Sequence, residues 1–140
     1  MDRSKRNQIE MNVIRWMAAN GIRLLRISMG IVFFWFGILK FFEGMSPAQD
    51  LAIKTIDIIT FHLLSAKLII YILAVWEVLI GIGLLFNLYM RITLILMFLQ
   101  MVGTFAPIFF FPDEVFKIFP YALTLEGQYI VKNIVIISGG

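Results

Sequence analysis

The sequence predicts an all-α integral membrane protein, a bundle of four helical segments that span a bilayer. Hydrophobic residues make up 61% of the 140 residues, charged residues make up 15%, and the mean hydropathy is +0.91. A soluble domain carries about 25% charged residues, so this chain has too little polar surface to coat a globule in water. Its apolar residues also gather into runs close to the roughly 20 residues with which a helix crosses the hydrocarbon core.

Residues 1–21 are polar and basic and precede the first apolar run. A few apolar side chains recur among them at helical spacing, namely Ile9, Val13, Trp16 and Met17. This pattern predicts an amphipathic helix that lies on the cytoplasmic surface of the membrane. We expect Asn20-Gly21 to end that helix, because this pair of residues favours turns.

Four apolar runs follow, at residues 22–42, 68–86, 92–111 and 128–140, and residues 22–140 form one transmembrane domain. The first three runs approach the ~30 Å thickness of the hydrocarbon core at ~1.5 Å per residue. The fourth covers only about 20 Å as a helix, so we expect the last span to be truncated at residue 140.

Residues 43–67 separate the first two apolar runs. They are too polar to cross a bilayer, since they carry Asp50, Lys54, Asp57 and His62. We therefore expect an interfacial or re-entrant segment between spans one and two.

Basic residues predict the orientation in the membrane. Six of the 12 Lys and Arg residues lie at or before the start of the first run: Arg3, Lys5, Arg6, Arg15, Arg23 and Arg26. Cytoplasmic flanks carry such an excess, which predicts a cytoplasmic N-terminus and larger loops on the opposite side. Because the positive charge is concentrated at this flank, we attribute it to anchoring at the lipid surface and expect no nucleic-acid partner.

Glu77 is the most informative single residue, because it lies about midway along the second run, ~15 Å from either end. A carboxyl group at that depth costs roughly 2.5–3.5 kcal/mol on insertion scales, so it must face the bundle interior and find a partner there. Ionisable residues inside a membrane most often serve a function. The alternative is a carboxyl group that only holds helices together by hydrogen bonds.

The same depth argument identifies possible partners for Glu77. Gln100 lies near the same midplane on the third run, whereas Lys132, Asn133 and Lys40 lie closer to the outer side. We favour Lys132 as the charge partner, within a polar column that leads from the midplane outward. Either lysine has an alternative role as an anchor that extends toward the outer head groups.

Several segments resemble the DoxX-like membrane proteins. RLLRISMGIVFFWFGILKF is similar to their first span, ILAVWEVLIGIGLLF to their second, and GQYIVKNIVIISGG to the start of their fourth. Glu77 falls on the acidic position of that family, and Lys132 with Asn133 on its Lys-Asn pair. SPAQDLA and QMVGTFAPIFFFP resemble the YkgB-like branch of inner-membrane proteins.

The resemblance implies a bacterial inner-membrane protein that serves a quinone-linked redox or oxidative-stress system. The chain has no cysteine and no metal cluster, catalytic triad or nucleotide-binding motif, so we expect no covalently bound cofactor. It would bind quinone or dock a soluble or membrane oxidoreductase, and a homo-oligomer is compatible with either role. Glu77 would donate or accept a proton, with Lys132 as its charge partner. The residues expected around the quinone are Trp76, Gln100, Asn133 and Lys40.

Two other functions stay open from the sequence. Ionisable residues at the membrane midplane are also typical of proteins that transport protons or small molecules. A structural or assembly subunit would use the same polar residues only to align its helices.

Overall fold

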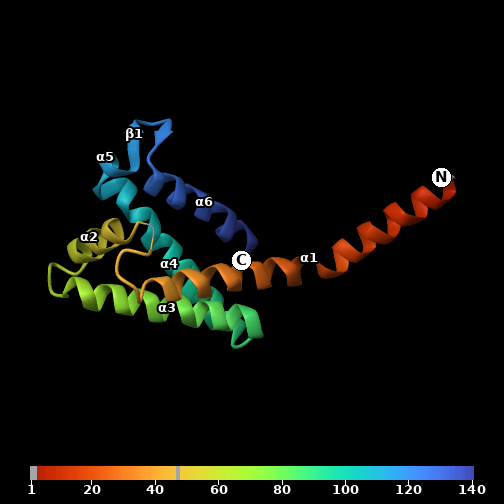
Figure 1. Cartoon of the computed structure of the whole chain (residues 1–140), viewed down its shortest axis with the longest axis horizontal. Helices are drawn as coiled ribbons and strands as arrows, with labels where there is room; N and C mark the ends of the chain where they lie inside the picture. The colour runs from red at the N-terminus through yellow and green to blue at the C-terminus, as the bar shows by residue number, and fades with distance from the viewer. Residues whose placement is uncertain (1–2, 47) are drawn as a thin grey trace.

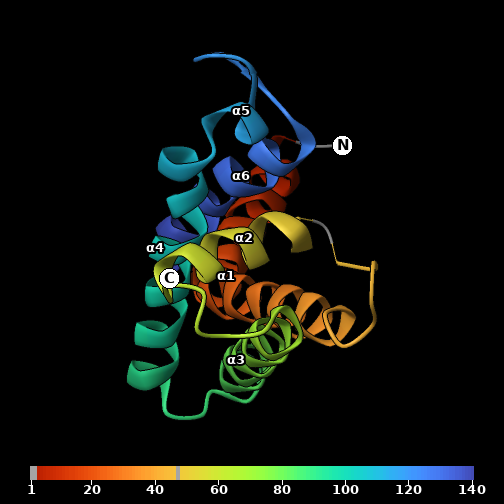
Figure 2. The same cartoon turned by 90° about the vertical axis from the view of Figure 1, so that its left-hand side faces the viewer.

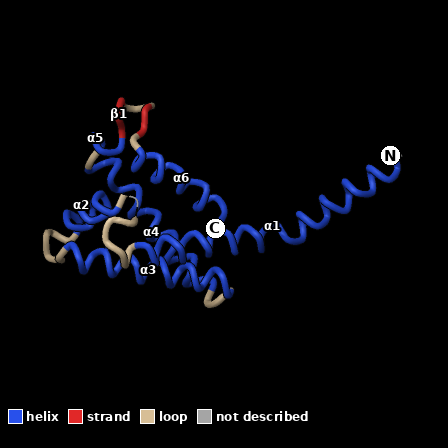
Figure 3. The backbone as a smooth tube through the Cα atoms, in the orientation of Figure 1, coloured by secondary structure: helices blue, strands red, loops and turns tan. Residues whose placement is uncertain are grey.

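The structure, a computed structural model, describes residues 3–46 and 48–140 and is mostly helical (Figures 1 and 3). In chain order its elements are α1 (Arg3–Leu39), α2 (Gln49–Ile59), α3 (Ala66–Phe86), α4 (Met90–Phe110), α5 (Pro112–Val115), β1 (Phe116–Ile118), β2 (Ala122–Leu123) and α6 (Leu125–Gly139). Among these, α1, α3 and α4 are long and apolar enough to cross a membrane. The prediction of an all-α membrane protein is confirmed.

α6 takes the place that the sequence assigns to the fourth span. It has 15 residues and packs against α4 and α5. The antiparallel hairpin of β1 and β2, which precedes α6, is not predicted by the sequence. Its strands contain three and two residues, too few to produce the alternation of polar and apolar residues that indicates a strand.

α1 continues through Asn20 and Gly21, so the expectation that a helix ends there is wrong. The Asn20 side chain donates a 2.9 Å hydrogen bond to the carbonyl of Trp16 in the same helix. A glycine inside a helix costs about 1 kcal/mol relative to alanine, and the unbroken backbone hydrogen bonds on both sides outweigh that cost. The N-terminal half of α1 projects away from the other helices (Figure 1). Its position on the membrane surface stays a prediction.

α1 packs antiparallel to α3 through close contacts at glycine residues. A Cβ atom added to Gly37 would lie 2.8 Å from the backbone nitrogen of Val78, and one added to Gly81 would lie 2.5 Å from that of Phe34. Small residues let membrane helices approach this closely, and the gain is van der Waals contact, because lipid is as apolar as the helices. These contacts set the register of the two helices and bring Gly37 against Glu77.

In this register the C-terminal end of α1 lies about half way along α3. α1 stops at Leu39, two residues after its contact with Glu77, whereas α3 extends in that direction as far as Ala66. Beyond this point α2 packs against α3 and α4 (Figure 2). Leu51 and Thr55 of α2 are buried. The polar segment between the first two spans is therefore folded into the bundle.

Gly81→Ala is expected to lower the stability by about 1–3 kcal/mol, the usual cost of overpacking a tight contact. The new methyl group would meet the backbone of Phe34, which cannot move aside without shifting α1. Gly103→Ala is the matched control, because a Cβ atom there meets nothing within 4 Å. Thermal unfolding in detergent measures both variants, and equal stabilities would contradict the packing argument.

The orientation is testable with single cysteines in this cysteine-free chain. Lys5 and Asp113 are both exposed, and the charge distribution predicts that they lie on opposite sides of the membrane. A membrane-impermeant maleimide added to intact cells is expected to label Asp113→Cys and to spare Lys5→Cys until the cells are lysed. Labelling of Lys5→Cys in intact cells would contradict this prediction and indicate the opposite orientation.

Candidate functional site

Glu77 faces the interior of the helix bundle. On α3 it shares one face with Ile70, Ala74, Ile80 and Leu84, at the three- and four-residue spacing that places side chains on the same side of a helix. All of these residues are buried, and Glu77 itself is only 8% exposed. The prediction that this acidic residue points inward is confirmed.

Both carboxylate oxygens of Glu77 have a partner. Nζ of Lys40 lies 2.7 Å from Oε2, and Nε2 of Gln100 donates a 2.5 Å hydrogen bond to Oε1. The two charged side chains are only 10% and 11% exposed. Removal of water strengthens their attraction, and this attraction together with the hydrogen bond from Gln100 offsets part of the cost of burying each charge. Lys40 reaches Glu77 because it lies three residues after Gly37, on the face of α1 that packs against α3.

The charge partner of Glu77 is therefore Lys40, and not Lys132 as the sequence favours. Lys132 is exposed on α6, and its Nζ lies 5.7 Å from the centroid of the Tyr129 ring. Neighbouring residues of a helix point about 100° apart. Lys132 thus faces outward, whereas the next residue, Asn133, faces the space between the helices.

A cavity of about 410 Å³ lies beside the ion pair. Residues of α1, α2, α3, α4 and α6 line it, and most of this lining is apolar. Five of the six residues predicted to form the site line this one cavity: Lys40, Trp76, Glu77, Gln100 and Asn133. The structure thus brings together side chains from four helical regions that are far apart in the sequence.

Three further polar residues line the cavity and were missed from the sequence. Thr104 lies four residues after Gln100, a spacing that predicts the same helix face, and it accepts a 3.4 Å hydrogen bond from Asn133. Thr55 and Tyr129 had no comparable signal, because the places of α2 and α6 in the bundle depend on tertiary contacts.

The side-chain oxygen of Gln100 is buried and has no hydrogen-bond partner in the described part of the chain. An ionised carboxylate only accepts hydrogen bonds, so the amide nitrogen of Gln100 must face Glu77 and its oxygen is left over. An unsatisfied buried polar atom costs about 1–3 kcal/mol. A hydroxyl or N–H group that reached this oxygen would recover that cost, so the site favours a ligand with a hydrogen-bond donor.

These features define a helical membrane protein with a buried ion pair beside a mostly apolar cavity. The model of the DoxX family matches residues 21–112, which extend from the middle of α1 to the start of α5. The chain belongs to the DoxX family. The matched region contains Lys40, Glu77 and Gln100, whereas Asn133 and Lys132 lie outside it. No curated protein and no solved structure gives a significant match.

Lys40→Met and Glu77→Gln are each expected to destabilise the protein by about 3–5 kcal/mol, because each leaves a buried group without its partner. The double variant is expected to lose less than the sum of the two single effects, since no unpaired charge remains. Lys132→Met is the matched control, the same exchange at an exposed position.

Thermal unfolding in detergent, applied to the single and double variants of each lysine with Glu77, measures both interaction energies. An interaction energy between Lys40 and Glu77 within about 0.5 kcal/mol of zero would show that the pair is not coupled. If the interaction energy of Glu77 with Lys132 were larger than that with Lys40, Lys132 would be the charge partner, as the sequence favours.

Proposed function

We propose that this protein binds the head group of a quinone in the cavity beside Glu77 and serves as an accessory membrane subunit of a redox or oxidative-stress system. The observation that carries the proposal is the cavity itself, a mostly apolar space with the Lys40–Glu77–Gln100 cluster in its wall. A quinone head is a flat, largely apolar ring that carries two oxygen atoms. The volume of about 410 Å³ falls within the range of about 300–1,000 Å³ for small-molecule sites.

The lining residues supply both kinds of hydrogen bond that such a head needs. Lys40 has three N–H groups and uses one toward Glu77, so it can also donate to a carbonyl oxygen. The unpartnered oxygen of Gln100 can accept from the hydroxyl group of the reduced form. Trp76 and Asn133 complete the lining. A bound quinone supplies two-electron chemistry, and the Glu77 carboxylate beside it can accept a proton from the reduced form and return it.

A partner protein completes the proposed system. The chain has no cysteine and so no thiolate ligands for an iron–sulfur cluster. We therefore assign the supply of electrons to a soluble or membrane-bound oxidoreductase that docks on this subunit. The proposed location is the bacterial cytoplasmic membrane, with the N-terminus in the cytoplasm.

The proposal is tested with menadione, a quinone head without a tail, and its reduced form, titrated into the protein in nanodiscs. Gln100→Leu is expected to weaken binding of the reduced form about tenfold or more, because the buried acceptor of its hydroxyl group is lost. Glu77→Gln is expected to weaken binding of both forms about tenfold or more, because it removes the charge that holds Lys40 in the cavity wall. Lys132→Met is expected to bind as the wild type does, since Lys132 does not line the cavity.

Each alternative predicts a different result. Equal affinity in all variants would place the quinone outside this cavity. Proton flux in proteoliposomes that needs Glu77 but no quinone would favour a transport function instead. Absence of both signals would favour a purely structural subunit.

A further inference from the structure

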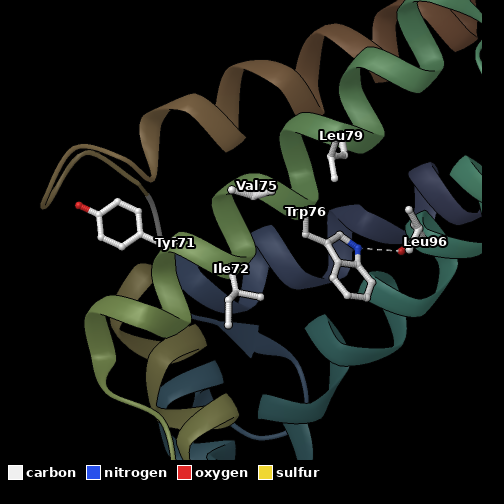
Figure 4. A pocket seen from close by; sticks show the side chains of 6 residues that line it. All are labelled: Tyr71, Ile72, Val75, Trp76, Leu79 and Leu96. Carbon is white, nitrogen blue, oxygen red and sulfur yellow. Dashed lines mark hydrogen bonds between the residues drawn. The ribbon is translucent and has the colours of Figure 1, made fainter.

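A second hollow, of about 370 Å³, lies between α3 and α4 on the outside of the bundle (Figure 4). Its lining is almost wholly apolar: Tyr71, Ile72, Val75, Trp76, Leu79 and Leu96. We call this hollow the α3–α4 groove. Tyr71 and Leu79, at its two ends along α3, are 52% and 56% exposed, so this face meets lipid in a membrane-spanning helix.

The α3–α4 groove and the cavity beside Glu77 meet at Ile72 and Trp76, which line both. The indole ring of Trp76 extends from α3 toward α4, where Nε1 donates a 3.1 Å hydrogen bond to the carbonyl of Leu96 (Figure 4). Glu77 is the next residue after Trp76. Trp76 therefore separates the polar cluster of the cavity from the lipid-facing groove.

We propose that the α3–α4 groove holds the apolar tail of the quinone whose head lies in the cavity, and that Trp76 is the gate through which this ligand enters from the bilayer. This inference rests on the proposed function and specifies its ligand: a quinone with an isoprenoid or alkyl chain. The ring lies in the cavity beside the Lys40–Glu77–Gln100 cluster, where an apolar chain has no hydrogen bond to make. The groove gives that chain a place on the lipid side of the same tryptophan.

The groove would raise the affinity for the chain through its shape, and not through the hydrophobic effect. A chain that leaves lipid for the groove exchanges one apolar environment for another, so its transfer by itself gains little. Binding instead improves through many small dispersion contacts between the chain and the side chains of the groove. A side chain that fills the groove should therefore affect tailed ligands alone.

Leu79→Trp fills the groove without touching the cavity, because Leu79 lines only the groove. Menaquinone with two isoprenoid units is expected to bind this variant about fivefold more weakly, the effect of losing roughly ten carbon–carbon contacts. Menadione is expected to bind it unchanged. Ile95→Trp is the matched control, an exposed position of α4 that lines neither hollow.

Each affinity is compared between variant and wild type in the same nanodiscs, so that partition of the ligand into lipid cancels. If Leu79→Trp weakened the binding of both ligands equally, or of neither, the proposal that the groove holds the tail would be wrong. Binding of menadione to the wild type would still support the proposed function. Failure of menadione to bind the wild type would overturn both.

The gate is tested separately with Trp76→Phe, which keeps an aromatic ring but removes the hydrogen bond to Leu96. The association rate of the tailed quinone, followed by stopped-flow, is expected to rise several-fold, because the ring is no longer tied to α4. An unchanged association rate would show that the ligand does not enter past Trp76.

Discussion

The ion pair between Lys40 and Glu77 is the constraint on which the rest of the structure depends. An acidic side chain half way through a membrane helix is tolerated only when a partner compensates its charge. The partner lies directly after α1, three residues beyond Gly37, so α1 must lie close enough to α3 for a lysine to reach Glu77. The glycine contacts meet this requirement, since Gly37 lies against Glu77 and Gly81 against Phe34.

A cavity lies beside this ion pair. Its lining comes from the last two turns of α1 and from α2, α3, α4 and α6. The ion pair borders this space. A polar cluster that satisfies the charge of Glu77 thus also gives an otherwise apolar space its few polar groups. The side-chain oxygen of Gln100 has no hydrogen-bond partner among the residues that the structure describes, so one acceptor of the cluster is left over.

Trp76 lies between the cavity inside this bundle and the α3–α4 groove on its lipid-facing side. In a soluble protein an apolar groove would indicate a partner, but a membrane helix presents apolar side chains to lipid along its whole outer face. The α3–α4 groove differs from the rest of that face because it shares Ile72 and Trp76 with a cavity that is lined by charged groups. A ligand with one polar and one apolar end matches this arrangement of surfaces, and a bilayer is the phase from which such a molecule arrives.

The sequence by itself determined the membrane class, the approximate spans and the inward direction of Glu77, because hydropathy and the cost of a buried charge are properties of single segments. It also identified Lys40, Trp76, Gln100 and Asn133, which the structure brings to one cavity. Only the tertiary structure decided which lysine pairs with Glu77. Depth along a helix is readable from residue numbers, but the choice depends on where α1 ends and how α6 is rotated. That rotation turns Asn133 inward and Lys132 outward, and the contacts between helices, not the order of residues, determine it.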